Sequence, residues 1–340
     1  MPQRFLVIGC GSIGRRHALN LQALNNAAIW VYDPNFPRMQ SLAAEYHFET
    51  CPSLEEAWAA QPNAALICAP TRFHFQLSRE ALLHGCDVFV EKPLADREEE
   101  LDELIELVGR RGAVAMVGHN LRYKPAFVQV QKWIQAGAIG RVLSAQFHYG
   151  SYLPARHPSE DYRQGYAARP ELGGGVILDA IHEIDAVQLV MGTPERVFCS
   201  AGQVSSLEIG TEDLAEMIMS YPDARCATVH LDYLQRPHQR WCQFTGEDGL
   251  IYCDLACGTA RLSVAGRNQW TEFNPGAELN DEYRAELQEF LDCLTSRRKP
   301  AVDAVEGAHA VRLALRLKQS AAERRPLVFT AAHAAQLGRN

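Results

Sequence analysis

The chain has 340 residues, of which 47% are hydrophobic and 22% charged, and its formal net charge is −8. This length exceeds the size at which one hydrophobic core usually keeps growing, so we expect a globular protein of two domains. No apolar run approaches the roughly 18 residues that cross a bilayer, and basic residues cluster only in short pairs, so neither membrane insertion nor electrostatic binding to nucleic acid is expected.

The N-terminus and the cysteines indicate a reducing compartment. Met1 leads almost directly into the first expected strand, which leaves no room for a signal sequence, and a cytoplasmic location is therefore expected. The closest cysteine pair, Cys253 and Cys257, lacks partners at zinc-site spacing. We expect reduced, mostly buried thiols and no metal site.

A glycine-rich turn follows the first expected strand, Phe5 to Ile8, and precedes a helix from Arg15 to Asn25. This G-x-G-x-x-G arrangement presents a helix N-terminus to the pyrophosphate of a dinucleotide. The cofactor-binding residues expected in the turn are Gly9, Gly11, Ser12, Ile13 and Gly14.

An acidic residue ends the next expected strand. Asp33 lies 19 residues after Gly14, close to the spacing of about 20 at which a carboxylate binds the adenosine ribose hydroxyls. Its charge would repel a 2′-phosphate, which favours NAD over NADP. Arg38 lies close enough in the sequence to leave NADP open.

Alternating helices and strands continue to about residue 117, which predicts a doubly wound parallel sheet. The expected elements are a helix beginning at Pro37, a helix capped by Ser53 with Glu56, the strand Ala65–Cys68, a helix over His74–His84, the strand Asp87–Val90, a helix capped by Asp96 and the strand Ala113–Val117.

The pattern then changes to an α+β region with a mostly antiparallel sheet. We therefore predict a Rossmann domain over residues 1–120 and a second domain over 121–340. The expected elements of the second domain are a helix over Pro125–Gln135, strands over Arg141–Tyr149, Ala215–Tyr221, Arg225–Tyr233, Arg240–Thr245 and Leu250–Cys253, and helices near Glu282–Leu294 and Val305–Ala321.

Lys92 directly follows a strand of the parallel sheet, in the tripeptide Glu91-Lys92-Pro93. Ligands of such sheets bind beyond the carboxyl ends of the strands, so Lys92 should face the nicotinamide. There it could hold a substrate oxygen and exchange a proton, with a pKa lowered by burial and the cofactor's charge. A solvated surface lysine is the alternative, which the rigid turn at Pro93 weakens.

A second candidate is the segment that begins with the glycine triplet at residues 173–175 and continues as an apolar helix. Asp179, His182 and Asp185 are spaced three apart, which on a helix places the imidazole between two carboxylates and suits an oriented base. The alternative is a histidine satisfied within the core.

The segment from Tyr152 to Arg163 is rich in aromatic and charged residues. Arginines bind carboxylates or phosphates, and tyrosine rings stack on sugars, so a polyhydroxylated or anionic substrate is expected there. Packing on a partner subunit is an equal alternative. The candidate substrate-binding residues are Tyr152, Arg156, Tyr162 and Arg163.

Together these motifs resemble the glucose–fructose oxidoreductase and inositol dehydrogenase family, often called Gfo/Idh/MocA, over nearly the whole chain. Besides the glycine turn and Glu91-Lys92-Pro93, the resemblance is carried by Pro70 with His74, Asn120 with Arg122 and Pro125, and His182-Glu183-Ile184-Asp185.

The resemblance implies NAD(P)-dependent oxidation or reduction of a sugar, inositol or sugar derivative, and dimers or tetramers built through a large open sheet in the second domain. Lys92 and His182 would be the catalytic lysine and histidine, and Asp179 the helix aspartate, although many members place that aspartate four residues before the histidine rather than three. Thr71 stands where an asparagine is common. The resemblance extends cofactor contacts to Pro70, His74, Glu91 and Lys92, and substrate contacts to Asn120 and Arg122.

The segment Tyr152 to Arg163, with Tyr166-Ala167-Ala168 and the glycine triplet, is similar to a subgroup associated with biosynthesis of bacterial surface sugars. Two alternatives to a dehydrogenase stay open. One is a redox-neutral glycosidase that retains NAD, and the other is a non-catalytic sensor of a dinucleotide or sugar.

Overall fold

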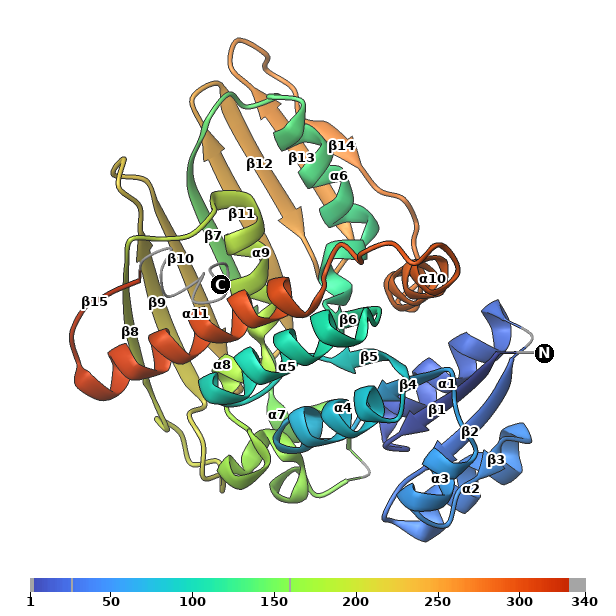
Figure 1. Ribbon diagram of the computed structural model, residues 1–340. Coiled ribbons are helices and arrows are strands. Elements are labelled where there is room, and N and C mark those ends of the chain that lie inside the picture. The colour runs from blue at the N-terminus through green and yellow to red at the C-terminus, as the bar shows by residue number, and fades with distance from the viewer. Residues whose placement is uncertain (1–2, 26, 159, 330–340) are drawn as a thin grey trace. The chain divides into compact units, whose positions relative to one another are not determined.

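The computed structural model describes residues 3–25, 27–158 and 160–329. The described residues form two compact units: one lies within residues 3–119 and 283–308, and the other lies within residues 120–282 and 309–329. Figure 1 shows their helices and strands along the chain.

The first unit is built on a six-stranded parallel sheet in the order β3-β2-β1-β4-β5-β6. This order confirms the predicted doubly wound sheet. From β1 the chain adds strands first on one side, as β2 and β3, and then on the other, as β4, β5 and β6, and such sheets bind their ligands at the point between β1 and β4 where the order switches. The strands are β1 (Arg4–Ile8), β2 (Ala28–Tyr32), β3 (Glu49–Thr50), β4 (Ala64–Ile67), β5 (Asp87–Glu91) and β6 (Ala115–Gly118).

Helices connect these strands, and their caps test two predictions. Ser53 caps the third helix, because its Oγ accepts a hydrogen bond from the backbone N–H of Glu56 at 3.2 Å, as predicted. The prediction that Asp96 caps the Glu-rich helix is wrong: the cap position is Arg97, whose side chain makes no capping bond, and Asp96 instead lies 3.5 Å from Arg72. The helices are α1 (Ser12–Leu24), α2 (Phe36–Tyr46), α3 (Leu54–Ala59), α4 (His74–Leu83) and α5 (Glu98–Arg111).

A segment from late in the sequence completes the first unit. Helix α10 (Asp281–Ser296) places Phe290 edge-on against Phe89 of β5, with ring centroids 5.7 Å apart. Further along, the backbone carbonyl of Val302 accepts a hydrogen bond from Val117 of β6 at 2.9 Å. Residues 283–308 therefore belong to the core of a unit that the first 119 residues begin.

The second unit contains a nine-stranded sheet in the order β14-β13-β12-β11-β7-β10-β9-β8-β15. All neighbouring strands are antiparallel except β7 and β10, which confirms the prediction of a mostly antiparallel sheet. The sequence did not reveal β8, β13, β14 or β15. The strands are β7 (Val142–Gly150), β8 (Arg196–Gly202), β9 (Leu214–Ser220), β10 (Cys226–Asp232), β11 (Gln239–Gly246), β12 (Gly249–Asp254), β13 (Thr259–Val264), β14 (Thr271–Phe273) and β15 (Leu327–Val328).

One face of this sheet is covered by helices. Buried residues such as Phe147, Val229 and Phe244 alternate with more exposed ones along the central strands, as expected for a sheet packed on one side. Helix α9 (Ile181–Met191) packs on β7 and β10, and α6 (Pro125–Gln135) packs on β12 and β13, as Figure 1 shows. Part of α11 (Ala304–Glu323) also contacts this sheet, because Oγ of Ser320 accepts a hydrogen bond from the backbone N–H of Cys199 in β8.

Two further observations concern the whole described chain. Among the described residues, no helix combines the length and the apolar character needed to span a membrane. All ten cysteines are free thiols, and all are buried except Cys226 and Cys257, as expected from the sequence.

Candidate functional site

Two glycines of the G-x-G-x-x-G turn are required by the packing of the turn itself. Gly9 has a φ of +99°, and a Cβ there would lie 2.5 Å from the carbonyl oxygen of Cys68. A Cβ on Gly14 would lie 1.8 Å from the carbonyl oxygen of Gly9. The turn can therefore close tightly between β1 and α1 only with glycine at both positions.

Gly11 has no such requirement. Its φ is −69°, and a Cβ there would have no described protein atom within 4 Å. Gly11 precedes α1, whose first backbone N–H groups point out of the helix end, and Ser12 and Ile13 begin that helix. Open space at a helix N-terminus that a side chain would fill is what the phosphates of a dinucleotide need, so these residues fit the cofactor expected from the sequence.

Asp33 is held at the end of β2 by the same turn. Its side chain is 7% exposed, Oδ2 accepts a hydrogen bond from the backbone N–H of Cys10 at 2.8 Å, and Oδ1 accepts one from Asn35 at 2.7 Å. Burial, together with the charge of Asp33, raises the pKa of the Cys10 thiol to about 12. Arg38 is half exposed and lies 3.8 Å from Asp33. Each carboxylate oxygen keeps a further lone pair with which it can accept a hydroxyl.

The carboxylate of Glu91 points into the first unit. Its Oε1 lies 2.6 Å from Nε2 of His17, and Glu286 completes a buried cluster with these two residues. Burial alone would raise the pKa of Glu91, but the hydrogen bond from His17 and the charges of His17 and Lys92 hold it below its ordinary value. The structure therefore anchors the end of β5 beneath Lys92, which is partly exposed and joined to Pro93 by a cis peptide bond.

His74 braces the segments that flank this turn. Its Nδ1 lies 2.6 Å from the carbonyl oxygen of Pro93, and its Nε2 lies 2.7 Å from that of Ala69. The imidazole is 1% exposed, and burial lowers its pKa. Pro70 precedes a short 3-10 helix, Thr71–Phe73, that leads into α4. His74 thus ties the residue after Lys92 to the residue before Pro70.

In the second unit, the glycine-led segment is not one continuous helix. Helix α8 (Val176–Asp179) ends at Ala180, whose φ and ψ are −99° and 36°, before α9 begins. The regular helical spacing expected between Asp179 and His182 is therefore interrupted, whereas His182 and Asp185 lie three residues apart within α9, as expected. Each carboxylate contacts an arginine from another element, Asp179 through Arg156 and Asp185 through Arg122.

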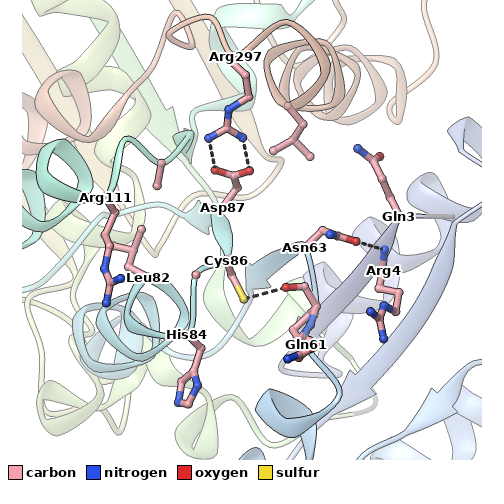
Figure 2. Close-up of a pocket in the computed structure, with 14 residues that line it drawn as sticks. Gln3, Arg4, Gln61, Asn63, Leu82, His84, Cys86, Asp87, Arg111 and Arg297 are labelled. Carbon is pink, nitrogen blue, oxygen red and sulfur yellow. Dashed lines mark hydrogen bonds and ion pairs between the residues drawn. The ribbon is translucent and has the colours of Figure 1, made fainter. Parts of the chain in front are cut away.

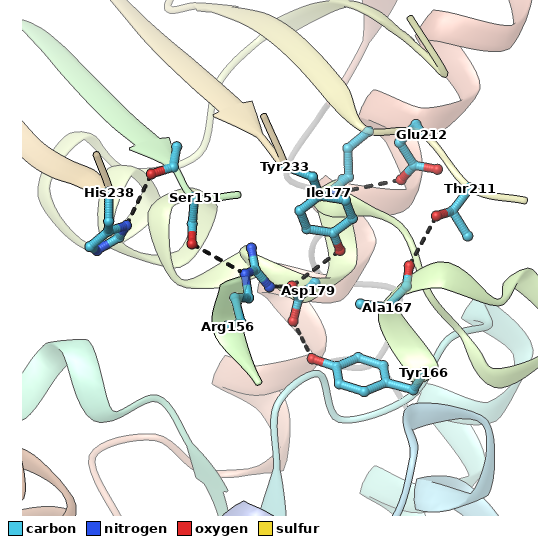
Figure 3. Close-up of polar contacts among 11 residues, drawn as sticks. Ser151, Arg156, Tyr166, Ala167, Ile177, Asp179, Thr211, Glu212, Tyr233 and His238 are labelled. Carbon is cyan, nitrogen blue, oxygen red and sulfur yellow. Dashed lines mark hydrogen bonds and ion pairs between the residues drawn. The ribbon is translucent and has the colours of Figure 1, made fainter. Parts of the chain in front are cut away.

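Asp179 is the centre of a buried polar cluster, which we call the Asp179 cluster: Arg156, Tyr166, Asp179 and Tyr233. Nη1 of Arg156 donates to Oδ2 of Asp179 at 2.6 Å, Tyr233 donates to the same oxygen at 3.1 Å, and Tyr166 donates to Oδ1 (Figure 3). The guanidinium also lies over the ring of Tyr233, 4.7 Å from its centroid.

The charges in the Asp179 cluster are fixed by its surroundings. Burial and the charge of Asp179 raise the pKa of both Tyr166 and Tyr233. Burial acts to lower the pKa of Arg156, but Asp179 outweighs this effect and raises it. At neutral pH the cluster therefore offers a cation and two phenol groups arranged around one carboxylate.

Two residues expected to bind substrate, Arg122 and Asn120, contact separate carboxylates, those of Asp185 and Glu282. Arg122 donates to both oxygens of Asp185, at 2.8 and 2.6 Å, and both side chains are nearly buried. Asn120 donates to Glu282 at 2.9 Å, and Lys124 pairs with the same carboxylate at 2.7 Å. Asn120 and Arg122 are thus part of the buried framework of the second unit.

His182 lies in the first turn of α9 and is partly exposed. The next residue, Glu183, is fully buried and accepts a hydrogen bond from Nε of Arg240 at 2.6 Å. This pair fixes the helix turn that carries His182.

The segment Tyr152 to Arg163 contains the short helix α7 (Leu153–Arg156), and Ser159 lies outside the described residues. Of its four predicted site residues, Arg156 joins the Asp179 cluster. The guanidinium of Arg236 lies over the ring of Tyr152, 3.5 Å from its centroid. The hydroxyl of Tyr162 accepts a hydrogen bond from the backbone N–H of Glu208. The half-exposed Arg163 pairs with the carboxylates of Asp161 and Glu208.

Sequence reasoning missed several residues that shape these sites. Tyr233 had no local signal, because it meets Asp179 only once β10 is placed in the sheet. His17 and Glu286 were also missed, since they are distant in sequence from Glu91. Tyr166 lay within a segment already singled out, but its role as a partner of Asp179 was not foreseen.

A separate pocket of about 640 Å³ opens in the first unit (Figure 2). It lies at the amino ends of β1, β4 and β5, where Arg4, Asn63 and Asp87 line it, and Arg297 pairs with Asp87 across it. Because the strands are parallel, the glycine turn and Lys92 lie at the opposite edge of the sheet. This pocket is therefore distinct from the dinucleotide site.

Two models of one protein family match the chain. The first, described as an oxidoreductase family with an NAD-binding Rossmann fold, matches residues 3–119, and the second, described as a GFO/IDH/MocA C-terminal domain, matches residues 127–252.

Individual relatives match most of the chain. The chain is 25% identical to a myo-inositol 2-dehydrogenase of Thermotoga maritima over 95% of this chain and 97% of the relative. It is 25% identical to a 2,7-anhydro-N-acetylneuraminate hydratase of Mediterraneibacter gnavus over 82% of this chain and 74% of the relative. A solved structure of UDP-N-acetylglucosamine 3-dehydrogenase from Acidithiobacillus ferrooxidans is similar with a TM-score of 0.79 and 25% identity, covering 94% of this chain and 98% of that chain.

Proposed function

Because this chain belongs to the Gfo/Idh/MocA family of oxidoreductases, we propose that it transfers a hydride between a nicotinamide cofactor and a secondary hydroxyl or carbonyl group of a sugar, inositol or sugar derivative. The observation that carries the proposal is the carboxylate of Asp33, fixed against the glycine turn by the N–H of Cys10. A turn with this acid and with open space at Gly11 suits a dinucleotide.

NAD is the proposed cofactor rather than NADP. Asp33 is nearly buried, and its two oxygens are oriented by backbone N–H groups, so it can accept hydrogen bonds from ribose hydroxyls without rearranging. The 2′-phosphate of NADP would place up to about two negative charges beside this carboxylate, which would repel it. Arg38 is the cation in reach of Asp33, and its half-exposed guanidinium is already close to that charge.

When bound, the nicotinamide accepts or returns the hydride at the reacting carbon. The residues of the chain must then handle the hydroxyl proton, and Lys92 and His182 are the proposed catalytic pair. Nζ of Lys92 holds the substrate oxygen, and the His182 imidazole takes or returns its proton, since a histidine exchanges protons readily at neutral pH. Glu91 and His74 are positioning residues for Lys92, because they fix the backbone on both sides of it.

The Asp179 cluster is the proposed place where the second unit meets the substrate. Its carboxylate, cation and phenol groups are the donors and acceptors that a polyhydroxylated molecule requires. Substrates named for relatives, an inositol and a UDP-linked amino sugar, are both polyhydroxylated, and this supports the proposed class. A precursor of bacterial surface sugars is one member of that class.

The test is a substrate panel. Purified protein with added NAD is mixed with inositols, free sugars, uronic acids and sugar nucleotides, and formation of reduced nicotinamide is followed by its fluorescence. One class of compound in the panel should give a steady, enzyme-dependent increase in this fluorescence, and the increase should be weaker when NADP replaces NAD. Calorimetry establishes that NAD binds in the same samples, so silence across the panel with NAD bound would reject the dehydrogenase.

A redox-neutral reaction with retained NAD is the second candidate. It is supported by the relative named as a 2,7-anhydro-N-acetylneuraminate hydratase. This candidate predicts conversion of an anhydro sugar or a glycoside by the chain while no reduced nicotinamide accumulates. Chromatography of the panel reactions, with an anhydro sugar and a glycoside added to the panel, separates the two candidates.

A further inference from the structure

Two histidines lie side by side on the nine-stranded sheet, at partly exposed positions that alternate with the buried residues of their strands. His148 of β7 and His230 of β10 are opposite each other in the one parallel pair of this sheet, and their rings stack with centroids 4.5 Å apart and planes 10° apart. Asp232 follows two residues after His230 on the same face of β10. Three side chains of the types that ligate metals thus lie together, although His148 and His230 are far apart in the sequence.

Their donor atoms gather closely. One nitrogen from each histidine and one oxygen of Asp232 all lie within 4.8 Å of one another. Nε2 of His230 is 2.8 Å from Oδ2 of Asp232, and Nε2 of His148 is 2.7 Å from Oε1 of Gln235. Ligand bonds of about 2.0 to 2.1 Å in tetrahedral geometry separate neighbouring ligand atoms by roughly 3.3 Å. Small side-chain rotations would bring these atoms to that spacing.

Gly150, at the end of β7, provides the room for the oxygens. A Cβ on Gly150 would lie 2.0 Å from Oε1 of Gln235 and 2.7 Å from Oδ2 of Asp232. Its backbone does not have a positive φ, so glycine is not required there by conformation. The need for glycine comes from two side-chain oxygens that converge over its Cα.

Outer contacts orient the donors as they do in known metal sites. Oε1 of Glu216 lies 2.6 Å from Nδ1 of His230, which places a proton on Nδ1 and leaves Nε2 to bind a metal. Oδ1 of Asp232 accepts hydrogen bonds from the backbone N–H groups of Leu234 and Gln235, at 2.7 and 2.8 Å, so that Oδ2 faces the histidines. A carboxylate behind a ligating imidazole is a common support for zinc.

We propose that His148, His230 and Asp232, with Oε1 of Gln235 as a fourth ligand, form a site for a divalent transition metal, with Zn²⁺ as the favoured ion. Two imidazole nitrogens and a carboxylate suit a metal of intermediate softness. When the metal binds, it takes the place of the proton that Nε2 of His230 shares with Asp232, and that proton is released to solvent. The proton that Nε2 of His148 donates to Gln235 moves through solvent to Nδ1 of the same ring, so that Nε2 can ligate the metal. The bound ion would link β7, β10 and the segment that follows β10.

The experiment uses the full chain without an affinity tag, stripped of metals with a chelator and kept reduced. Co²⁺ serves as the spectroscopic probe, because tetrahedral sites give it intense visible absorption, and Zn²⁺ is then added in competition. We expect one ion per chain. His148→Gln and His230→Gln should each abolish the band, and Glu216→Gln should weaken Co²⁺ binding by roughly 10- to 100-fold, as loss of an outer partner does.

Matched controls make the result decisive. His309→Gln removes a histidine of the same unit outside this cluster and should leave Co²⁺ binding unchanged. Cys226→Ser removes the exposed thiol on β10 and should also have no effect. Absence of the band in the wild-type protein, a band retained in both His148→Gln and His230→Gln, or a band lost in Cys226→Ser would overturn the proposal. Thermal unfolding of every variant, compared with the wild type, verifies that the second unit is folded.

Discussion

At the scale of single residues, Lys92 is the clearest test of the proposed chemistry. Lys92→Ala should leave NAD binding nearly unchanged and lower turnover by roughly 10²- to 10⁴-fold, the usual contribution of a general acid or base. Steady-state rates with the substrate found in the panel measure this loss. Lys132→Ala, at an exposed position of α6, is the matched control and should retain full activity. An unchanged rate in Lys92→Ala would remove this residue from the mechanism.

Asp33 should determine the choice of cofactor. Asp33→Ala removes an acceptor whose charged hydrogen bonds contribute about 1.5 to 3 kcal/mol each, so NAD should bind roughly 10- to 100-fold more weakly. NADP should lose less, because the repulsion of its 2′-phosphate is also removed. Calorimetric titration of both cofactors checks this shift, and an equal loss for NAD and NADP would contradict the assignment to the ribose.

The pair of His17 and Glu91 makes a prediction about stability and pH. His17→Ala leaves a buried carboxylate without its partner, which should cost about 3 to 5 kcal/mol of unfolding free energy at neutral pH. The folded-state pKa of Glu91 is lowered, so the pair's contribution is present above the ordinary carboxyl pKa of about 4.3 and is lost as the pH falls through the folded value.

Urea unfolding at a series of pH values measures this effect. The difference between wild type and His17→Ala should shrink toward acid, and the double variant His17→Ala with Glu91→Gln should recover part of the loss because the unpaired charge of Glu91 is removed. A difference that does not change with pH would show that the charge of Glu91 is not responsible.

Residue types and spacing were enough to single out Asp33, Lys92 and His182 as candidates. Asp33 stands at a set distance from the glycine turn, Lys92 directly follows a strand, and His182 lies between two acidic residues spaced three residues away. The partners of these residues were not predictable in the same way. Arg156 and Tyr233 reach Asp179 from distant segments, and such contacts depend on strand pairing and helix placement rather than on local pattern.

At the scale of elements, the glycine turn offers a matched pair of substitutions. Gly14→Ala would place a Cβ 1.8 Å from the carbonyl oxygen of Gly9, so it should destabilise the first unit by several kcal/mol or prevent folding. Gly11→Ala meets no described atom within 4 Å and should fold normally, yet bind NAD at least tenfold more weakly.

Thermal unfolding and calorimetric NAD titration, applied to both variants, separate the two effects. If Gly11→Ala bound NAD as tightly as the wild type, the phosphates would not lie against this turn. If Gly14→Ala were as stable as the wild type, the close packing of α1 on the turn would be disproved.

The elements also show where periodicity fails. Apolar spacing from Val176 onward predicted one helix, but it cannot detect the interruption at Ala180, because alanine is a strong helix former. The short edge strands β14 and β15 gave too few residues for an alternating pattern. Helix α6 and the strands β7, β9, β10, β11 and β12 were predictable within a residue or two, since their hydrophobic pattern is strong.

At the scale of the whole molecule, the fold class could be read from the order of helices and strands, while the composition of each unit could not. Phe290 packs on Phe89, and Arg297 pairs with Asp87, so the first unit is completed by a segment about 200 residues later, as the separation of 210 positions in the Arg297 pair shows. No local signal in the sequence specifies which sheet a late amphipathic helix will cover.

The central claim is that the chain moves a hydride from a secondary alcohol carbon to nicotinamide, and an isotope measurement tests it most directly. The substrate identified by the panel is prepared with deuterium on the carbon that bears the reacting hydroxyl, and the released cofactor is analysed by mass spectrometry. The account predicts one deuterium in the reduced nicotinamide for each product molecule. Product that forms while the released cofactor stays oxidised and unlabelled would contradict it.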